Sequence, residues 1–301
     1  MNNQSDVVTR SGFVALIGAP NAGKSTLINQ LVGEKISIVT HKVQTTRRLI
    51  RGIVQYQQSQ IILVDTPGIF KPGKNLDKAM VSTAWQGVKD ADIILLLIDA
   101  VTGITSNVEE LLQGIVNNKK RKLLVLNKVD KIDRKKLLAL TNELNQKVNF
   151  QDTFMISALT SEGCEDLIKY LAEHLPLGPF YYPEDQISDL PLRYLAAEIT
   201  REKLLLRLHE EIPYAATVET EIWEEKKDGS VKVQQVIYVE RQNQKRIILG
   251  HNGETIKAIG QASRLELSEF LKQKVHLFLF VKVRPNWRSD AERYKEMGLN
   301  L

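Results

Sequence analysis

The chain has 301 residues, enough for two ordinary domains, and its 43% hydrophobic and 26% charged residues exclude a largely disordered protein. A single cysteine, Cys164, excludes an intramolecular disulfide, and the start MNNQSDVVTR has no apolar signal core, so we expect a cytoplasmic protein. The net charge is +5, but residues 241–288 alone hold ten Lys and Arg against three acidic residues, which favours a polyanionic partner for that segment.

Short β-branched runs alternate with amphipathic stretches up to about residue 176. The runs are FVALI, IILVD, IILLLID, KLLVL and TFMI, and the stretches that follow them cover residues 24–33, 76–90, 106–118, 134–147 and 164–174. This alternation predicts βαβ units, which form a mostly parallel sheet with helices on both faces. The segment LIRGIVQYQQSQIILVD predicts a hairpin that adds one antiparallel strand. We therefore expect an α/β domain over residues 1–176.

The first loop of this domain, GAPNAGKS at residues 18–25, matches the pattern G-x-x-x-x-G-K-[ST] between a predicted strand and a predicted helix. Backbone N–H groups of such a loop converge on phosphates, Lys24 can reach the β- and γ-phosphates, and Ser25 can hold Mg²⁺. A glycine-rich turn that caps a helix is the alternative. The predicted phosphate-binding residues of the loop are Gly18, Ala19, Pro20, Asn21, Ala22, Gly23, Lys24, Ser25 and Thr26.

The segment VTHKVQTTRR, residues 39–48, lies where a nucleotide-dependent switch loop is expected. One threonine of such a loop would bind Mg²⁺ and sense the γ-phosphate, and we favour Thr46 over Thr45. An ordinary polar loop is the alternative.

A second switch is predicted at VDTPGIF, residues 64–70. Asp65 would hold Mg²⁺ through water and the N–H of Gly68 would contact the γ-phosphate, with Thr66 and Pro67 lining the phosphates between them. In Ras-type GTPases the next residue is the glutamine that orients the attacking water, but here it is Ile69. An alkyl side chain forms no hydrogen bonds, so either hydrolysis is absent or other groups place the water.

The tetrapeptide NKVD at residues 127–130 follows the buried run KLLVL and predicts the base contact. The carboxylate of Asp130 can accept hydrogen bonds from N1 and N2 of guanine, and adenine offers neither donor. Asn127 would tie this loop to the P-loop, and the stem of Lys128 would cover the base. A third loop, SAL at residues 157–159, fits recognition of the guanine O6 by backbone N–H groups of Ser157, Ala158 and Leu159. Together these loops predict GTP rather than ATP.

Residues 176–191 contain four prolines and have no helical period, which predicts a linker at residues 177–190. Beyond it we expect a small α+β domain over residues 191–301. Its predicted elements are a helix (191–211), two strands joined by KKDG (214–240), a short segment KRIILG, a helix (254–273), the strand VHLFLFVKVR and a final helix.

This second domain contains a G-x-x-G loop that leads into a predicted helix. Its residues are Gly250, His251, Asn252 and Gly253, and Lys257 follows one turn into the helix. Such loops clamp the backbone of unpaired nucleotides in KH domains, although a simple turn before a helix is the commoner meaning of the pattern. The basic surroundings, Lys257 and the order of the elements favour RNA binding.

The motifs GAPNAGKS, QTTRR, DTPG, NKVD and SAL occur in the order seen in the Era family of GTPases, which this chain resembles over nearly its whole length. The resemblance implies an α/β P-loop GTPase domain followed by a type II KH domain, with Mg²⁺ as cofactor and slow basal GTP hydrolysis. It implies Lys24, Thr46 and Gly68 as catalytic residues. A hydrophobic residue commonly follows DTPG in this group, so Ile69 does not indicate an inactive site.

The resemblance also implies further ligands and partners. Relatives with the form G-x-P-N-x-G-K-S use K⁺, so Asn21 is a candidate K⁺ ligand, with a turn-stabilising asparagine as the alternative. The family implies a monomer that binds the 3′ end of 16S rRNA and acts in assembly of the 30S subunit. A GTPase acting at the inner membrane or in cell-cycle control is the alternative, which the G-x-x-G loop and the lack of a long basic amphipathic helix disfavour.

Overall fold

The computed structural model describes residues 8–42, 45–69, 75–208, 212–287 and 299. The chain divides into two compact units. The first comprises Met1–Ser37, Val43–Asp189 and Met297–Leu301, and the second comprises Ile38–Lys42 and Leu190–Glu296.

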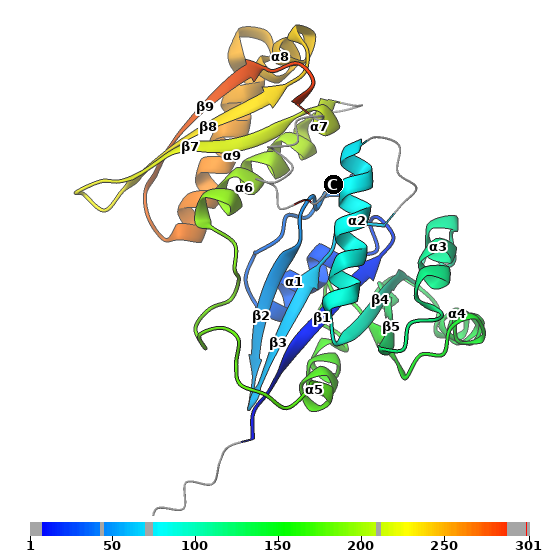
Figure 1. Ribbon diagram of the computed structural model, residues 1–301. Coiled ribbons are helices and arrows are strands. Elements are labelled where there is room, and N and C mark those ends of the chain that lie inside the picture. Colours follow the sequence, from blue (N-terminus) through cyan, green and yellow to red (C-terminus); the bar gives the residue numbers. More distant parts are fainter. Residues whose placement is uncertain (1–7, 43–44, 70–74, 209–211, 288–298, 300–301) are drawn as a thin grey trace, which may run out of the picture. The chain divides into compact units, whose positions relative to one another are not determined.

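The first unit is built on a six-stranded sheet with the strand order β2-β3-β1-β4-β5-β6 (Figure 1). Only the β2–β3 hairpin is antiparallel, as the sequence predicts, and the other neighbours are parallel. The strands are β1 (Arg10–Gly18), β2 (Ile50–Tyr56), β3 (Ser59–Asp65), β4 (Ile93–Asp99), β5 (Arg121–Asn127) and β6 (Asp152–Ile156). The helices are α1 (Lys24–Val32), α2 (Asn75–Asp90), α3 (Ser106–Ile115), η1 (Val129–Lys131), α4 (Arg134–Lys147) and α5 (Cys164–His174).

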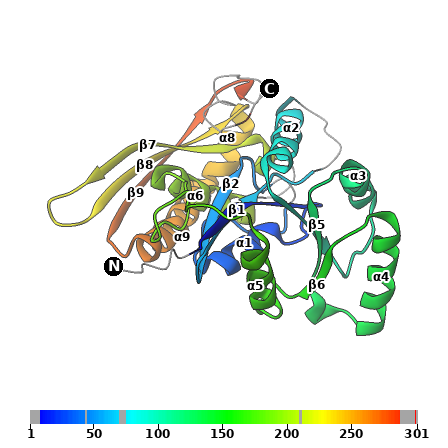
Figure 2. The same ribbon diagram turned by 60° about the horizontal axis from the view of Figure 1, so that its bottom comes forward.

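Helices cover both faces of this sheet (Figure 2). One core cluster joins β1, β4 and β5 to α2, α3 and α4, whereas α1 and α5 contact the strands from the other face. The central strand β4 is buried from Ile93 to Ile98 because helices lie on both sides of it. A run without polar alternation, IILLLI, is the sequence signature of that position.

The proline-rich segment at residues 177–189 follows the first unit instead of crossing open solvent. The Ile53 N–H of β2 donates to the Ile187 carbonyl at 2.9 Å, and Gln60 Nε2 of β3 donates to the Tyr182 carbonyl at 2.8 Å. These bonds fix the segment on the antiparallel edge of the sheet.

The second unit packs helices against a three-stranded sheet with the order β7-β8-β9 (Figure 1). Strands β7 and β8 are antiparallel, and β9 is parallel to β8 because two helices cross over between them. The strands are β7 (Thr217–Glu225), β8 (Val231–Val239) and β9 (Val275–Val283). The helices are α6 (Leu192–Arg207), α7 (Ile212–Ala215), α8 (Gln242–Leu249), η2 (His251–Gly253) and α9 (Glu254–Leu271).

One element of this unit is more helical than the sequence indicates, and another lies outside the described residues. The segment KRIILG, to which the sequence assigns neither helix nor strand, comprises the last five residues of α8 and its Gly250 C-cap. Gln244 accepts the N–H of Arg241 at 3.0 Å in the first turn, and Ile248 is buried against the sheet. The predicted final helix falls on residues outside the described ranges. Among the helices that the structure describes, none has the length and apolar character needed to cross a bilayer.

Candidate functional site

The predicted nucleotide motifs of the first unit lie at one edge of its sheet. Strands β1, β3, β4, β5 and β6 run parallel, and the loops that follow their carboxyl ends hold GAPNAGKS, DTPG, NKVD and SAL. In open α/β sheets, ligands bind outside the carboxyl ends of the strands.

The P-loop has the backbone geometry of an anion site. Asn21 and Gly23 have left-handed φ values of 63° and 102°, and Gly23 precedes α1 without a side-chain cap on the first N–H groups of the helix. Successive N–H groups in such a loop point inwards, and the positive end of the helix dipole adds to them. The loop can therefore bind phosphate through its main chain.

Lys24 places a buried ammonium inside this loop. Its Nζ donates to the carbonyls of Gly18 at 2.9 Å and Ala19 at 3.3 Å. Burial lowers the pKa of Lys24, and attraction to Asp65 offsets part of that effect. A Cβ built on Gly68 would lie 3.7 Å from Nζ, so the DTPG loop passes beside the ammonium. The charge thus lies between the two loops expected to hold phosphates.

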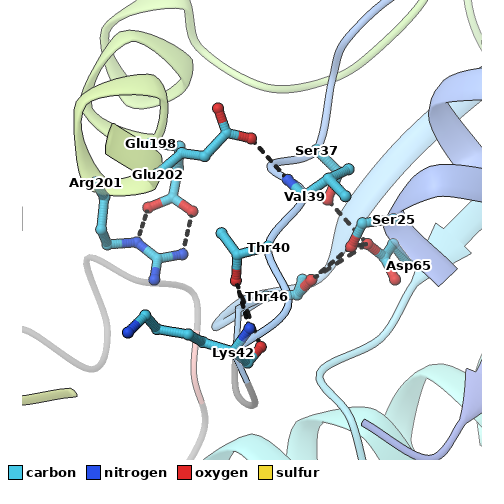
Figure 3. Close-up of polar contacts among 10 residues, drawn as sticks. All are labelled: Ser25, Ser37, Val39, Thr40, Lys42, Thr46, Asp65, Glu198, Arg201 and Glu202. Carbon is cyan, nitrogen blue, oxygen red and sulfur yellow. Dashed lines mark hydrogen bonds and ion pairs between the residues drawn. The ribbon is translucent and has the colours of Figure 1, made fainter. Parts of the chain in front are cut away.

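Asp65 collects three hydroxyl donors on one carboxylate oxygen (Figure 3). Its Oδ2 accepts from Ser37 at 3.0 Å, Ser25 at 3.1 Å and Thr46 at 3.4 Å, and the Ser25 and Thr46 hydroxyls lie 3.1 Å apart. Burial raises the pKa of Asp65, while Lys24 and the three hydroxyls act in the opposite direction.

The same carboxylate carries an acceptor that the protein leaves unused. Among the described residues, Asp65 Oδ1 is buried and has no hydrogen-bond partner. Two ligands of an octahedral Mg²⁺ at right angles lie about 2.9 Å apart, close to the separation of the Ser25 and Thr46 hydroxyls. Two hydroxyls with this spacing and an unused carboxylate oxygen suit a hard cation and its bound water. The structure thus brings Thr46, the favoured switch threonine, to this cluster.

Two neighbouring side chains have structural contacts. The Thr66 hydroxyl donates to the Leu16 carbonyl at 2.8 Å, so only its backbone is available to phosphates. Ile69 is fully buried in the core cluster that contains Ile17 and Ala84. An alkyl side chain in the core has no access to an attacking water, and the position of Ile69 is explained by packing.

Asn127 joins the three loops expected to surround a guanosine. Its Nδ2 donates to the Ala22 carbonyl of the P-loop at 2.8 Å, and its Oδ1 accepts the N–H of Ala158 at 2.9 Å. Gly23 packs closely against the same amide: a Cβ built on Gly23 would lie only 2.3 Å from Asn127 Nδ2, so a side chain does not fit there. The Asn127 side chain therefore fixes the positions of the P-loop and the SAL loop relative to each other.

Lys128 lies across the P-loop with a left-handed φ of 67°. Its Nζ donates to the Asn21 carbonyl at 2.9 Å and pairs with Asp99 Oδ2 at 2.6 Å. Its stem is thus stretched across the edge of the site, while Asp130, in the turn η1, is exposed to solvent. An exposed carboxylate beside a fixed aliphatic stem can receive a planar base.

Sequence reasoning missed two residues of this site, Asp99 and Ser37. Burial acts against the charged form of Asp99, but its hydrogen bond and ion pair with Lys128 prevail and lower its pKa. In the sequence, Asp99 could have been found as a carboxylate at the carboxyl end of the buried strand β4. Ser37 follows α1 in a polar loop, and no local pattern relates it to Asp65.

The G-x-x-G loop of the second unit has the open backbone expected of a clamp. Gly250, Asn252 and Gly253 have φ values of 74°, 48° and 78°, and a Cβ on Gly250 would lie 2.2 Å from Thr255 Oγ1. The side chains of His251 and Asn252 are exposed. The main chain of the loop can therefore come close to a ligand.

A groove of about 530 Å³ begins directly after this loop, between α9 and β9. Leu277 and Leu279 of β9 give it an apolar wall, and Lys257 and Arg264 of α9 give it two cationic side chains. The other lining residues are Ile256, Gly260 and Gln261. Apolar walls suit unstacked bases and cations suit the phosphates that connect them.

Two families match the chain. Residues 13–128 match the family described as 50S ribosome-binding GTPase, and residues 211–288 match the KH domain.

The chain is also similar over nearly its whole length to curated proteins and solved structures. The protein named GTPase Era from Brucella suis biovar 1 (strain 1330) is 68% identical over 97% of this chain and 94% of its own length. GTPase Era from Mesorhizobium japonicum is 65% identical over the same shares.

Two crystal structures superpose with a TM-score of 0.91 at 39% identity, over 96% of this chain and 99% of theirs. One is Era in complex with MgGDPNP and nucleotides 1506–1542 of 16S ribosomal RNA, and the other is an Aquifex aeolicus Era variant bound to GDP·AlF4⁻.

Proposed function

The chain belongs to the Era family of GTPases, and we propose that it is a GTP-dependent switch that binds the 3′ end of 16S rRNA during assembly of the 30S ribosomal subunit in the cytoplasm. The observation that carries the proposal is the apolar, cation-lined groove beside the G-x-x-G loop. Support comes from the 39% identical Era that binds a fragment of 16S rRNA. An unstacked base fits such a groove better than a lipid headgroup does, which favours RNA over a membrane contact.

The P-loop N–H groups, Lys24 and the Gly68 N–H would bind the phosphates of GTP, and Ser25, Thr46 and Asp65, the last through water, would hold Mg²⁺. The bound metal supplies positive charge that offsets the charge developing on the phosphates. Asp130, Asn127 and the SAL loop would select guanine. Since Ile69 is buried, backbone groups of the two switch loops would place the attacking water.

We expect Ile69→Ala to lower stability and to retain hydrolysis. The side chain is fully buried, and truncation of a core isoleucine costs about 2–5 kcal/mol. Thermal melting and GTP turnover below the melting transition would measure the two effects. Ile69→Val, with a cost of about 0.5–1.5 kcal/mol, is the graded control. A folded Ile69→Ala protein that binds GTP and has no turnover would contradict this account of the water.

We expect GTP turnover to be faster in KCl than in NaCl at equal ionic strength. Asn21 lies in the P-loop, and its side-chain oxygen would help to bind K⁺ beside the phosphates. The difference between the salts should shrink in Asn21→Ala and also in Asn21→Gly. The glycine variant is needed because Asn21 has a φ of 63°, which strains alanine and suits glycine. Equal turnover in both salts would leave Asn21 as a turn residue only.

We expect the double variant His251→Asp/Asn252→Asp to bind RNA at least about tenfold more weakly, equivalent to about 1.4 kcal/mol. Both side chains are exposed, and aspartate tolerates the left-handed φ of Asn252, so folding and GTP binding should persist. Two new negative charges would then face the phosphates that the loop clamps.

The RNA is a short single strand from the 3′ end of 16S rRNA, and binding is measured with GDP and with a non-hydrolysable GTP analogue. The control is Gln242→Asp/Asn243→Asp, which adds the same charges at the exposed opposite end of α8, about 12 Å away along the helix axis. Equal RNA affinities for the wild type and a folded loop variant would remove the loop from RNA binding. Equal wild-type affinities in both nucleotide states would remove the switch.

A further inference from the structure

The residues that follow α1 turn back onto the helix and are held there by Asn29. Gly33 ends the helix with a left-handed φ of 82°. Asn29 Oδ1 accepts the N–H groups of Ile36 at 3.0 Å and Ser37 at 2.9 Å, and Asn29 Nδ2 donates to the Ser37 carbonyl at 2.7 Å. One side-chain amide therefore binds both backbone groups of Ser37 and fixes this residue against α1.

The side chain of Ser37 points to the carboxylate of Asp65 (Figure 3). Its hydroxyl donates to Asp65 Oδ2 at 3.0 Å, and Ser25 donates to the same oxygen at 3.1 Å. Ser25 and Asn29 are four residues apart in α1, so they lie on one face of the helix. Helix α1 therefore reaches Asp65 by two routes, directly through Ser25 and indirectly through Asn29 and Ser37.

Ser37 differs from the other two hydroxyl donors, because the assigned metal site does not use it. Ser25 and Thr46 would give their hydroxyl oxygens to Mg²⁺, whereas Ser37 is buried and donates to Asp65. The terminal torsion of an aspartate has a broad preference, so hydrogen bonds decide how its carboxylate is turned. A donor fixed on Oδ2 leaves Oδ1 for a metal-bound water, and within the described part of the chain Oδ1 accepts no hydrogen bond.

We propose that Ser37 is a positioning residue for the Mg²⁺ site: held by Asn29, it fixes the Asp65 carboxylate so that Oδ1 can accept from a metal-bound water. The proposal rests on the assignment of Ser25 and Asp65 to Mg²⁺. Neither Ser37 nor Asn29 is assigned to the nucleotide. Loss of the contact should therefore weaken Mg²⁺ binding and leave metal-free nucleotide binding unchanged.

The test measures the affinity for a fluorescent GDP analogue in EDTA and over a series of buffered Mg²⁺ concentrations, which together give the dissociation constant of Mg²⁺. Hydrogen bonds that orient metal ligands change metal affinity by about 10–100-fold. Because Asp65 would hold the metal through water, Ser37→Ala should weaken Mg²⁺ binding by about tenfold, the lower end of that range. The affinity for the GDP analogue in EDTA should not change.

Asn29→Ala tests whether Asn29 acts through Ser37. By itself this variant should also weaken Mg²⁺ binding, and in the Ser37→Ala background it should cost little more. Ser59→Ala is the matched control, because Ser59 begins β3, the strand that ends at Asp65, and its buried hydroxyl donates to the Ala172 carbonyl at 3.0 Å. The control should leave Mg²⁺ binding unchanged.

Wild-type Mg²⁺ affinity in folded Ser37→Ala would overturn the proposal. An equal loss of GDP affinity with and without Mg²⁺ would also overturn it, because the damage would then lie in the nucleotide site as a whole. Full additivity of Asn29→Ala and Ser37→Ala would overturn the role of Asn29. Wild-type Mg²⁺ affinity in Ser25→Ala would separately refute the assignment of Ser25 to the metal.

Discussion

Asp130→Asn is expected to weaken GTP binding by at least about 100-fold, or 2.7 kcal/mol, and to admit xanthosine triphosphate. The carboxylate of Asp130 would accept hydrogen bonds from N1 and N2 of guanine, and an amide can accept only one of them while its NH₂ group meets the N2 donor. Xanthine has an oxygen at that position, which the NH₂ group can bind. Asp130 is exposed in η1, so the substitution should not disturb the fold.

The matched control is Asp133→Asn, three residues further along the chain. Asp133 caps α4 by accepting the N–H of Lys135 at 2.8 Å, and asparagine caps helices about as well as aspartate. This variant removes the same charge near the site and should leave both affinities unchanged. Binding of fluorescent GTP, xanthosine triphosphate and ATP analogues measures the result. Equal ATP and GTP affinities in the wild type would exclude the assignment of Asp130.

The sequence predicts where these loops lie in the fold, because each motif is continuous and directly follows a strand. GAPNAGKS, DTPG and NKVD need only the parallel sheet to bring them to one edge, and the alternation of runs predicts that sheet. The contact of Asn127 with the P-loop follows from the same geometry.

The parts that could not be predicted depend on contacts between distant segments. Ser37 and Asp65 are separated by 28 positions, and neither residue type nor spacing relates them. Helix α8 was missed for a local reason: Ile247 and Ile248 are β-branched and favour a strand, but burial of Ile248 and the Gly250 cap favour a helix. Ile69 occupies the position that the water-orienting glutamine has in Ras-type GTPases, but its side chain is part of the core.

Gly23→Ala is expected to reduce GTP affinity at least about 100-fold, because two independent features exclude a side chain there. The φ of 102° is left-handed, which costs a residue with a Cβ about 1–2 kcal/mol. The new Cβ would also lie 2.3 Å from Asn127 Nδ2, the atom that donates to the Ala22 carbonyl. To make room, Asn127 has to move, and both the P-loop and the SAL loop lose the side chain that joins them.

Gly33→Ala is the control that separates backbone strain from the steric clash with Asn127. Gly33 ends the same helix with a left-handed φ of 82°, but no atom lies within 4 Å of a Cβ built on it. The variant should lower stability by a similar 1–2 kcal/mol, roughly, and leave GTP affinity unchanged. Asn127→Ala provides the second comparison, because it removes the atom that the new Cβ would strike. If the clash is the cause, Gly23→Ala should cost much less GTP affinity in the Asn127→Ala background than in the wild type, as measured by titration with a fluorescent GTP analogue. A Gly23→Ala variant with wild-type affinity, or a Gly33→Ala variant with an equal loss, would show that the join at Asn127 does not control the nucleotide site.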